Sequence, residues 1–156
     1  MDIYTDKNPC CKLFSDIEKT KLGFAYFSNS KELIFDPKTK SILFNDVPVM
    51  TDVFDYENGI VEIKSSGWYY IQYILNIPST AQITSIFSLY KDDLLLEGSI
   101  INISKKDTKN SMCFSAQTIH KLEKNSKLSI KSTLPLNIKN SLNYENIVSL
   151  FILKLM

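Results

Sequence analysis

The residues of this chain with the clearest chemistry are its three cysteines. Cys10 and Cys11 are adjacent and close to the N-terminus, whereas Cys113 lies far from them in the sequence. Adjacent cysteines rarely form a disulfide with each other, because the bridge would strain the geometry that a disulfide requires. An odd number of cysteines is typical of free buried thiols or of intermolecular disulfides. The spacing leaves both alternatives open.

The sequence around the cysteines separates the pair from the single residue. Cys113, in the segment SMCFSAQ, is equally typical of a small buried side chain in a strand. Cys10 and Cys11 follow Asn8-Pro9 in a segment that is too polar and irregular to form a core of its own. Their thiols are therefore exposed unless this segment docks on something.

Patterns for catalysis and metal binding are weak. His120 is the only histidine, and in a strand it is more often an edge or core side chain than a general base. A zinc site needs clustered ligands, and His120 with Cys113 does not supply four. Asp92 and Asp93 lie between Tyr90-Lys91 and a leucine run, a position that is more typical of a hairpin turn than of a calcium-binding or acid pair. The sequence has no glycine-rich phosphate loop, nucleophile elbow or HExxH motif. We therefore expect a protein that is not an enzyme, with no catalytic residues, no cofactor and no metal.

Composition excludes further classes of function. The chain has 18 cationic and 17 acidic side chains, and all the cations are lysine. Nucleic-acid-binding surfaces usually have a net basic face with arginine for bidentate contacts, so we expect no nucleic-acid partner. No run approaches the roughly eighteen apolar residues of a membrane span, and the N-terminus lacks the basic-then-apolar order of a secretory signal. We therefore expect synthesis in the cytosol and no membrane partner.

Residues 1–20 differ in character from residues 21–156. The first part is polar with sparse apolar side chains, which is typical of an extended arm with at most one helical turn. The second part alternates short apolar and aromatic segments with turn residues, and it lacks helical periodicity. We predict a connector arm followed by an all-β sandwich or barrel. The ten or so expected strands span 22–28, 31–36, 41–46, 59–64, 67–77, 84–91, 93–100, 111–122, 126–133 and 146–155.

The expected strand 67–77 is apolar on both faces. Tyr69, Ile71 and Tyr73 fall on one face, whereas Trp68 and Tyr70 fall on the other. A strand with one face in water should have a polar second face, so we expect both faces to be covered. The cover is either a loop or second sheet, or a subunit interface, whose core favours Tyr and Trp.

The expected closing strand, 146–155, has the same two-sided character. Phe151, Leu153 and Leu155 lie on one face, and Leu150 and Ile152 lie on the other. Two such strands favour an oligomer, because a monomer rarely exposes large contiguous apolar patches.

Several short motifs follow one another in a characteristic order. They are Leu22-Gly23-Phe24-Ala25-Tyr26, Val47-Pro48-Val49, Phe54, Gly59-Ile60-Val61-Glu62-Ile63, Gly67-Trp68-Tyr69 with Ile71 and Tyr73, Ser88-Leu89-Tyr90-Lys91-Asp92-Asp93, Leu96-Glu97-Gly98-Ser99, Leu122, Leu128-Ser129-Ile130 and Val148 to Leu155. This order resembles the C1q and tumour-necrosis-factor superfamily of trimeric jelly rolls. Within it, the chain most resembles the C-terminal domain of the collagen-like glycoproteins of the bacterial spore surface, the exosporium. The resemblance implies a jelly-roll trimerisation domain of about ten strands.

The chain departs from that pattern in two places. A collagen stalk with glycine at every third position is expected upstream, but the sequence has only four glycines and no such repeat. The Gly-Asp usually expected before the Leu-x-Ile strand is replaced by Asn125-Ser126. The N-terminal arm thus takes the place of the stalk.

An arm with adjacent cysteines ahead of a jelly roll also resembles the connectors of bacterial endospore appendage, or pilus, subunits. The resemblance implies that the arm cysteines, Cys10 and Cys11, form intermolecular disulfides with a neighbouring subunit, with Cys113 as acceptor. Because each chain has two arm thiols and one acceptor thiol, one arm cysteine bonds to another arm or to a different protein, or stays free. It also implies synthesis in the reducing cytosol of the mother cell and a final location on the spore surface, where oxidant is available after lysis.

The leading hypothesis is a non-enzymatic structural subunit that forms homotrimers and polymerises head to tail through its arm. In it, the Tyr69, Ile71 and Tyr73 face and the Phe151, Leu153 and Leu155 face divide between the monomer core and the threefold axis. A spore-coat anchor protein or a terminal adhesin is a further partner under this hypothesis. The alternative is a soluble C1q/TNF-like trimeric binding or adhesion module of the spore surface. The loops at 36–38 and 105–110 are either simply solvated or, as in trimeric relatives, contact a partner.

Overall fold

The described part of the chain is built from strands. The structure is a computed structural model that describes residues 22–36, 38, 40–46, 48–134, 137–139 and 146–156. The expected arm at 1–20, with Cys10 and Cys11, and its boundary with the domain lie outside the described residues. Within the described ranges there are fourteen strands and no helix, and so no helix there is long and apolar enough to span a membrane. The all-β prediction is confirmed.

The strand bounds follow the apolar segments of the sequence. In chain order the strands are β1 (Phe24–Asn29), β2 (Glu32–Asp36), β3 (Ser41–Leu43), β4 (Val49–Met50), β5 (Phe54–Glu57), β6 (Ile60–Ile63), β7 (Gly67–Ile77), β8 (Ile83–Lys91), β9 (Leu94–Leu95), β10 (Ile101–Lys105), β11 (Met112–Leu122), β12 (Lys127–Ser132), β13 (Asn137–Lys139) and β14 (Val148–Lys154).

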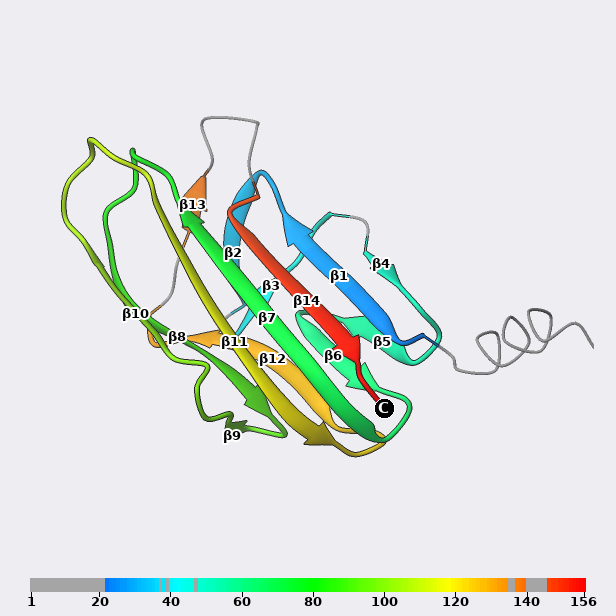
Figure 1. The fold of residues 1–156 in the computed structure, drawn as a ribbon. Coiled ribbons are helices and arrows are strands. Elements are labelled where there is room, and N and C mark those ends of the chain that lie inside the picture. The colour runs from blue at the N-terminus through cyan, green and yellow to red at the C-terminus, as the bar shows by residue number, and fades with distance from the viewer. Residues whose placement is uncertain (1–21, 37, 39, 47, 135–136, 140–145) are drawn as a thin grey trace, which may run out of the picture.

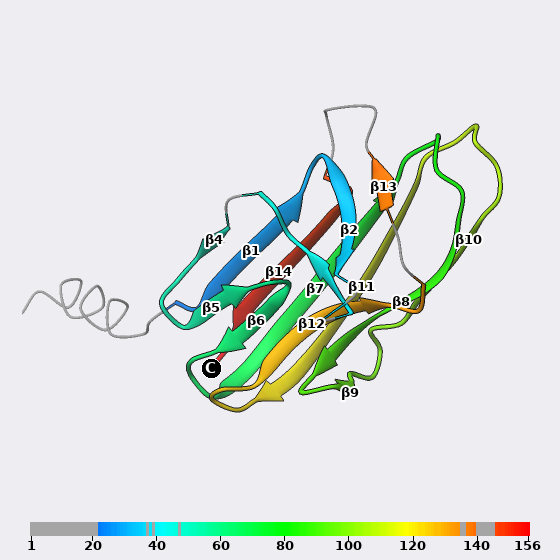
Figure 2. The ribbon, with the colours of Figure 1, turned by 180° about the vertical axis from the view of Figure 1, so that it is seen from behind.

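Two large sheets lie face to face, and a small one adjoins them (Figure 1). The five-stranded sheet has the order β11-β7-β14-β1-β4, and the six-stranded sheet has the order β10-β8-β12-β6-β5, with β9 paired to β8. The small sheet, β13-β2-β3, lies beside the sandwich, as the reverse view in Figure 2 shows. All the strand pairings between described residues are antiparallel.

The core lies between the two large sheets and is centred on β7. Tyr69, Ile71 and Tyr73 point into it and are fully buried, as the alternation of β7 requires. The Tyr73 hydroxyl lies 3.1 Å from the carbonyl oxygen of Phe87 and 2.5 Å from that of Ser99, and these two acceptors share its one proton. The buried hydroxyl thus finds its hydrogen-bond partners on the opposite side of the core. The second sheet therefore supplies the cover for this face of β7.

The sandwich has two distinct ends along the strand direction. At the Leu22 end, β1 begins with Phe24, next to the last residues of β14. At the Cys113 end, β11 begins with Met112 and β7 ends with Ile77, and these two residues are paired. Figure 1 shows the two ends on opposite sides of the long sheet. These names are used below.

Two tight turns are visible in the sequence as Asn-Gly and Asp-Asp. Asn58 and Gly59 join β5 to β6 with positive φ values of 50° and 82°. A side chain at Gly59 would meet the carbonyl oxygen of Ile42 at 2.6 Å, so glycine is required there. Asp92 and Asp93, with φ values of 49° and 66°, join β8 to β9, which is the hairpin turn expected for them.

The strand expected at 93–100 is wrong in its extent. Only Leu94–Leu95 pairs as β9, and the chain then turns at Gly98, whose φ is 75°. Leu96 enters the core, and the buried Ser99 hydroxyl donates to the Leu96 carbonyl at 2.7 Å. Within the leucine run, therefore, only Leu96 contributes to the core, and Leu94 and Leu95 are exposed.

The prediction of a solvated loop at 105–110 is wrong for its first residue, Lys105. Lys105 is the last residue of β10 and is only 1% exposed. The strands β4, β5, β10 and β13 were not expected from the sequence. β4, β5 and β13 are short, with two to four residues, whereas β10 carries a readable alternation in Ile101-Asn102-Ile103-Ser104 that sequence reasoning missed.

Candidate oligomerisation surface

The five-stranded sheet has a second face that points away from the core, here called the outer face. Its members follow from the strand register, because residues directly opposite each other in an antiparallel pair lie on the same side. The outer face consists of Phe24, Tyr26, Ser28, Val49, Trp68, Tyr70, Gln72, Ile74, Asn76, Cys113, Ser115, Gln117, Ile119, Lys121, Ser149, Phe151 and Leu153.

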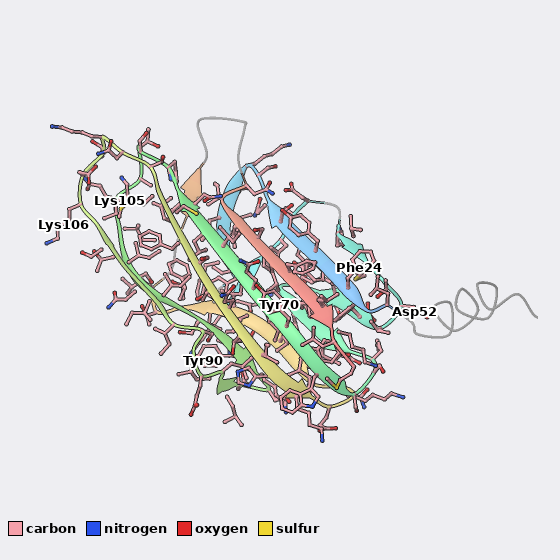
Figure 3. The ribbon with its side chains drawn as sticks, in the orientation of Figure 1. Phe24, Asp52, Tyr70, Tyr90, Lys105 and Lys106 are labelled. Atoms are coloured by element: carbon pink, nitrogen blue, oxygen red, sulfur yellow. The ribbon has the colours of Figure 1, made fainter. Side chains whose placement is uncertain are left out.

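Two neighbouring cross-strand rows of the outer face are rich in apolar and aromatic side chains. The row nearer the Leu22 end contains Phe24, Leu153, Tyr70 and Ile119. The next row contains Tyr26, Phe151, Gln72 and Gln117. The rings of Tyr70 and Phe151 meet edge to face, with their centroids 6.4 Å apart. Figure 3 labels Tyr70 over the middle of the sheet and Phe24 on the side of the sheet where β4 lies.

The polar ends of the outer-face aromatics are held by hydrogen bonds. The Tyr70 hydroxyl donates to Oε1 of Gln117 at 2.9 Å. The Tyr26 hydroxyl accepts from Nδ2 of Asn146 at 2.8 Å. These bonds limit ring motion before any partner arrives, which lowers the entropy cost of association.

The rows are open to solvent in the single chain. Ile119 in the first row is 54% exposed, and Val49, which extends the second row beside Tyr26, is 55% exposed. Trp68, beyond the first row toward the Leu22 end, is 44% exposed. Aromatic residues are enriched in the cores of protein interfaces, and large apolar patches on a monomer mark interaction sites. The outer face therefore has the chemistry of a surface that another protein chain covers.

The outer face becomes polar toward the Cys113 end. The third row contains Ser28, Ser149, Ile74 and Ser115, and beyond it Asn76 stands opposite Cys113. The aromatic rows lie toward the Leu22 end. An interface on this face is therefore apolar near the root of the N-terminal segment and polar near the cysteine.

The six predicted core or interface residues divide between the two sides of the sheet. Tyr69, Ile71 and Tyr73 are in the monomer core. Phe151 and Leu153 are on the outer face. Leu155 follows β14 and is 44% exposed, and its amide donates to the Trp68 carbonyl at 2.7 Å. Their assignment to a threefold axis stays a prediction.

Sequence reasoning missed the contribution of β1 to the outer face. Phe24 and Tyr26 point outward, whereas the intervening Ala25 and the following Phe27 are fully buried. The alternation in Phe24-Ala25-Tyr26-Phe27 is a signal for this, but four consecutive apolar residues do not reveal which pair faces the core.

Cys113 is exposed and free, and it lies on the outer face at the Cys113 end. The alternative that Cys113 is a small buried side chain is wrong. Cys113 pairs with Asn76, whose side chain is on the outer face, so the Cys113 side chain points to the same side of the sheet. Cys10 and Cys11 lie outside the described residues, so their pairing with Cys113 stays a prediction.

The described residues offer little acid–base or metal chemistry. Nε2 of His120 lies 3.4 Å from the Glu97 carbonyl oxygen, on the side of β11 opposite the outer face. No group of three or more His, Cys, Asp or Glu side chains in the described ranges is placed to hold a metal ion. Burial raises the pKa of Tyr69 and of Tyr73, so these phenols stay neutral core residues.

Comparison with known proteins identifies the fold. No protein-family model matches the sequence, and no curated protein is similar to it. Crystal structures of murine APRIL at pH 8.0 and at pH 5.0 superpose with TM-scores of 0.59 and 0.60. Each is 9% identical in sequence, and the match covers 86% of this chain and 100% of the other. The expected C1q/TNF-like jelly-roll fold is therefore confirmed.

Proposed function

We propose that this chain is a non-enzymatic structural subunit that forms homotrimers through its outer face and polymerises head to tail into a fibre or appendage on the surface of a bacterial spore. The observation that carries the proposal is the apolar surface of Phe24, Tyr26, Tyr70, Phe151 and Leu153 across three neighbouring strands, in which Tyr26 is exposed and the other four side chains are half-buried. A soluble chain that leaves these rows in water invites non-specific association, so a dedicated partner is required.

A second copy of the chain is the partner proposed for the outer face. Closed threefold symmetry needs a heterologous contact, in which one surface of a subunit meets a different surface of the next. The outer face offers one surface, and the unpaired edge of β11, with the exposed Met112, offers the other. A stable contact of this kind buries about 800 Å² on each partner. The resemblance to trimeric jelly rolls supports the same arrangement.

The positions of the two ends support head-to-tail growth. The N-terminal segment joins β1 at the Leu22 end, where Phe24 shares a cross-strand row with Tyr70 of β7, whereas Cys113 lies opposite Asn76. Six residues of strand separate these points, which corresponds to about 20 Å. A segment that leaves one copy at the Leu22 end therefore approaches the Cys113 end of the next copy in a stack.

The reach of the segment is sufficient for such a link. Cys11 precedes Phe24 by 13 positions in the sequence. A chain of that length spans at most about 45 Å when fully extended. Three arms for each trimer would raise the effective concentration at the next trimer, and disulfides to Cys113 would make the link resistant to dissociation.

The cross-link is an oxidation that occurs after synthesis. Each disulfide joins two sulfur atoms and releases two protons and two electrons, which a small disulfide or another oxidant accepts. A reducing mother cell keeps the thiols free during assembly of the trimer, and exposure of the spore supplies the oxidant. This order of events accounts for a chain that is made in the cytosol and ends as a cross-linked surface protein.

The test compares the wild type with a Cys10→Ser/Cys11→Ser double variant. Wild-type protein oxidised with a small disulfide should form filaments by negative-stain microscopy and a covalent ladder on non-reducing gels. The double variant should keep the trimer and lose the ladder. A Cys113→Ser variant tests the acceptor, because it should lose the ladder as well. Uniform trimers without a ladder in the wild type would contradict the fibre.

One observation favours the second candidate, a soluble trimeric binding or adhesion module. Ile86, Leu94, Leu95 and Ile100 are exposed apolar side chains that lie away from the outer face, around β8, β9 and the start of β10. A trimer built on the outer face leaves them in solvent, where they suit a further partner. The same gels and images decide between the candidates, because the binding module predicts discrete trimers in every variant.

A further inference from the structure

Lys105 is a buried cation at the Cys113 end of the sandwich. It is the last residue of β10 and is 1% exposed, whereas its neighbour Lys106 is exposed. Figure 3 shows both lysines at the end of the molecule away from Phe24. A buried ammonium group destabilises a protein unless each of its three N–H donors finds an acceptor. The trimerisation surface does not use Lys105, so its presence needs another explanation.

All three donors of the Lys105 ammonium are used. Nζ donates to the carbonyl oxygens of Ser79 at 3.1 Å and Ala81 at 2.8 Å, both in the connection between β7 and β8. It also donates to the carbonyl oxygen of Asp107, in the connection between β10 and β11. One side chain therefore ties together two connections that are far apart in the sequence.

The Asp107 side chain continues the linkage toward β11. Its Oδ1 accepts hydrogen bonds from the amides of Lys109 at 3.0 Å and Asn110 at 3.3 Å. These two bonds, with the charge of Lys105 nearby, hold the pKa of Asp107 below its ordinary value. The carboxylate is thus ionised at neutral pH and holds the loop that enters β11 at Met112.

The two tied connections are direct continuations of the strands that carry Cys113. β7 ends at Ile77, which pairs with Met112, and the preceding residue Asn76 pairs with Cys113. The 78–82 connection follows Ile77, and the 106–111 connection precedes Met112. Displacement of either connection therefore moves the end of the ladder on which the thiol is placed.

We infer that Lys105 is a positioning residue that fixes the start of β11 and so sets where the Cys113 thiol is presented to the arm of a neighbouring copy. This inference rests on the proposed function, because it assigns Lys105 a role in that cross-link. A disulfide forms only when the two Cα atoms come within about 4.4 to 6.8 Å of each other, so a mobile acceptor strand captures an incoming thiol less efficiently. Buried charges generally add little to stability compared with apolar groups of the same volume. We therefore assign Lys105 a role in positioning the start of β11 and not in stabilising the fold.

The first measurement is amide hydrogen exchange of the trimer carrying Lys105→Met, with Lys106→Met as the matched control. Methionine keeps most of the side-chain volume of Lys105 and removes its three donors. Amides of 106–113 should exchange about tenfold faster in Lys105→Met, because the loops open locally, while amides of 69–75 in β7 stay protected. Lys106→Met should leave both regions unchanged. Equal exchange in the two variants would overturn the inference.

The second measurement is the rate of the covalent ladder at equal trimer concentration, with oxidised glutathione as electron acceptor. Lys105→Met should slow ladder formation by about fivefold relative to Lys106→Met. Alkylation of Cys113 by iodoacetamide, followed in the Cys10→Ser/Cys11→Ser background, should change by less than about twofold, because the thiol is already exposed. A fall in the ladder with unchanged alkylation identifies positioning. Equal ladder rates in the two variants would contradict it.

A second variant covers the case in which Lys105→Met fails to fold. Asp107 is exposed, so Asp107→Ala removes the bonds to Lys109 and Asn110 without opening the core. It should accelerate exchange at 109–113 and slow the ladder, and Asp107→Asn, which keeps an acceptor oxygen, should restore both. If the wild type forms no ladder at all, the proposed fibre fails, and the exchange experiment still decides whether Lys105 holds these loops.

Discussion

The two exterior faces of the sandwich carry different kinds of side chain. The outer face of the five-stranded sheet has rows of aromatic and aliphatic residues, including Tyr70 and Phe151. The corresponding exterior of the six-stranded sheet, here called the charged face, carries ion pairs. Lys64 lies 3.0 Å from Glu62, and Lys131 lies 2.5 Å from Asp93.

The difference indicates which exterior is suited to remain in contact with solvent. On the charged face, the Lys131 ammonium also lies 4.9 Å from the centre of the Tyr90 ring, so an aromatic residue is shielded by a charge. On the outer face, the aromatic rings instead contact other rings and amide groups. A solvated exterior needs charges that keep chains apart, whereas an interface must be free of unpaired charge. The charged face also exposes Ile86, Leu94 and Leu95, but it lacks the cross-strand aromatic rows of the outer face. The comparison therefore supports the proposal that the chain associates through the outer face.

The largest effect is expected from a charge placed in the outer face. Phe151→Asp would bury an unpaired carboxylate in the proposed interface and should weaken trimerisation by at least about 1000-fold. Sedimentation analysis over a range of concentrations measures this. Thr84→Asp, at an exposed position of β8, is the control and should leave the trimer intact. Equal behaviour of the two variants would remove the distinction between the faces.

A smaller effect separates the two sides of β7. Ile71 is fully buried in the core, and Ile71→Ala should lower the free energy of unfolding by about 3 kcal/mol through lost burial and a cavity. Ile74, which points to the outer face, should cost less than about 1 kcal/mol in the separated subunit when replaced by Ala. Urea unfolding in the Phe151→Asp background, in which the subunits are expected to be separated, measures both. A larger loss for Ile74→Ala than for Ile71→Ala would reverse the assignment of the faces.

The smallest effect is expected from the charged face and depends on pH. The hydrogen bond and charge of Lys131 lower the pKa of Asp93 below its ordinary value of 3.8. Because the folded-state pKa is the lower one, this pair stabilises the fold above pH 3.8, and the contribution is lost as the pH falls through the folded-state value. The loss should be small, since Asp93 is exposed to solvent.

Urea unfolding at pH 5 and pH 3 tests the pair. Asp93→Asn should lose less stability between these two pH values than the wild type does, and Lys131→Met should behave in the same way. The double variant should show no further change. An unchanged pH dependence in Asp93→Asn would show that other carboxylates account for all of the acid sensitivity.

Much of the fold was readable because the turns and the alternation are local. Asn58-Gly59 and Asp92-Asp93 mark hairpins by their tolerance of positive φ, and both are found there. The prediction of a strand over 93–100 was wrong because Leu96 and Ser99 are held by hydrogen bonds to Leu89 of β8, which the local sequence does not reveal. Lys105 was expected in a loop because lysine is rarely buried, and only carbonyl groups from distant residues make burial acceptable there.

By itself, the sequence determined that this protein is all-β, where its main turns lie, and that β7 is apolar on both sides. These properties follow from residue types at spacings of one to a few positions, and they need no knowledge of other strands. Only the tertiary structure decided which side of β7 is core, because that depends on which strand pairs with it and on which sheet covers it. For the same reason, only the tertiary structure placed Cys113 outward opposite Asn76 and gathered Ser79, Ala81 and Asp107 around Lys105.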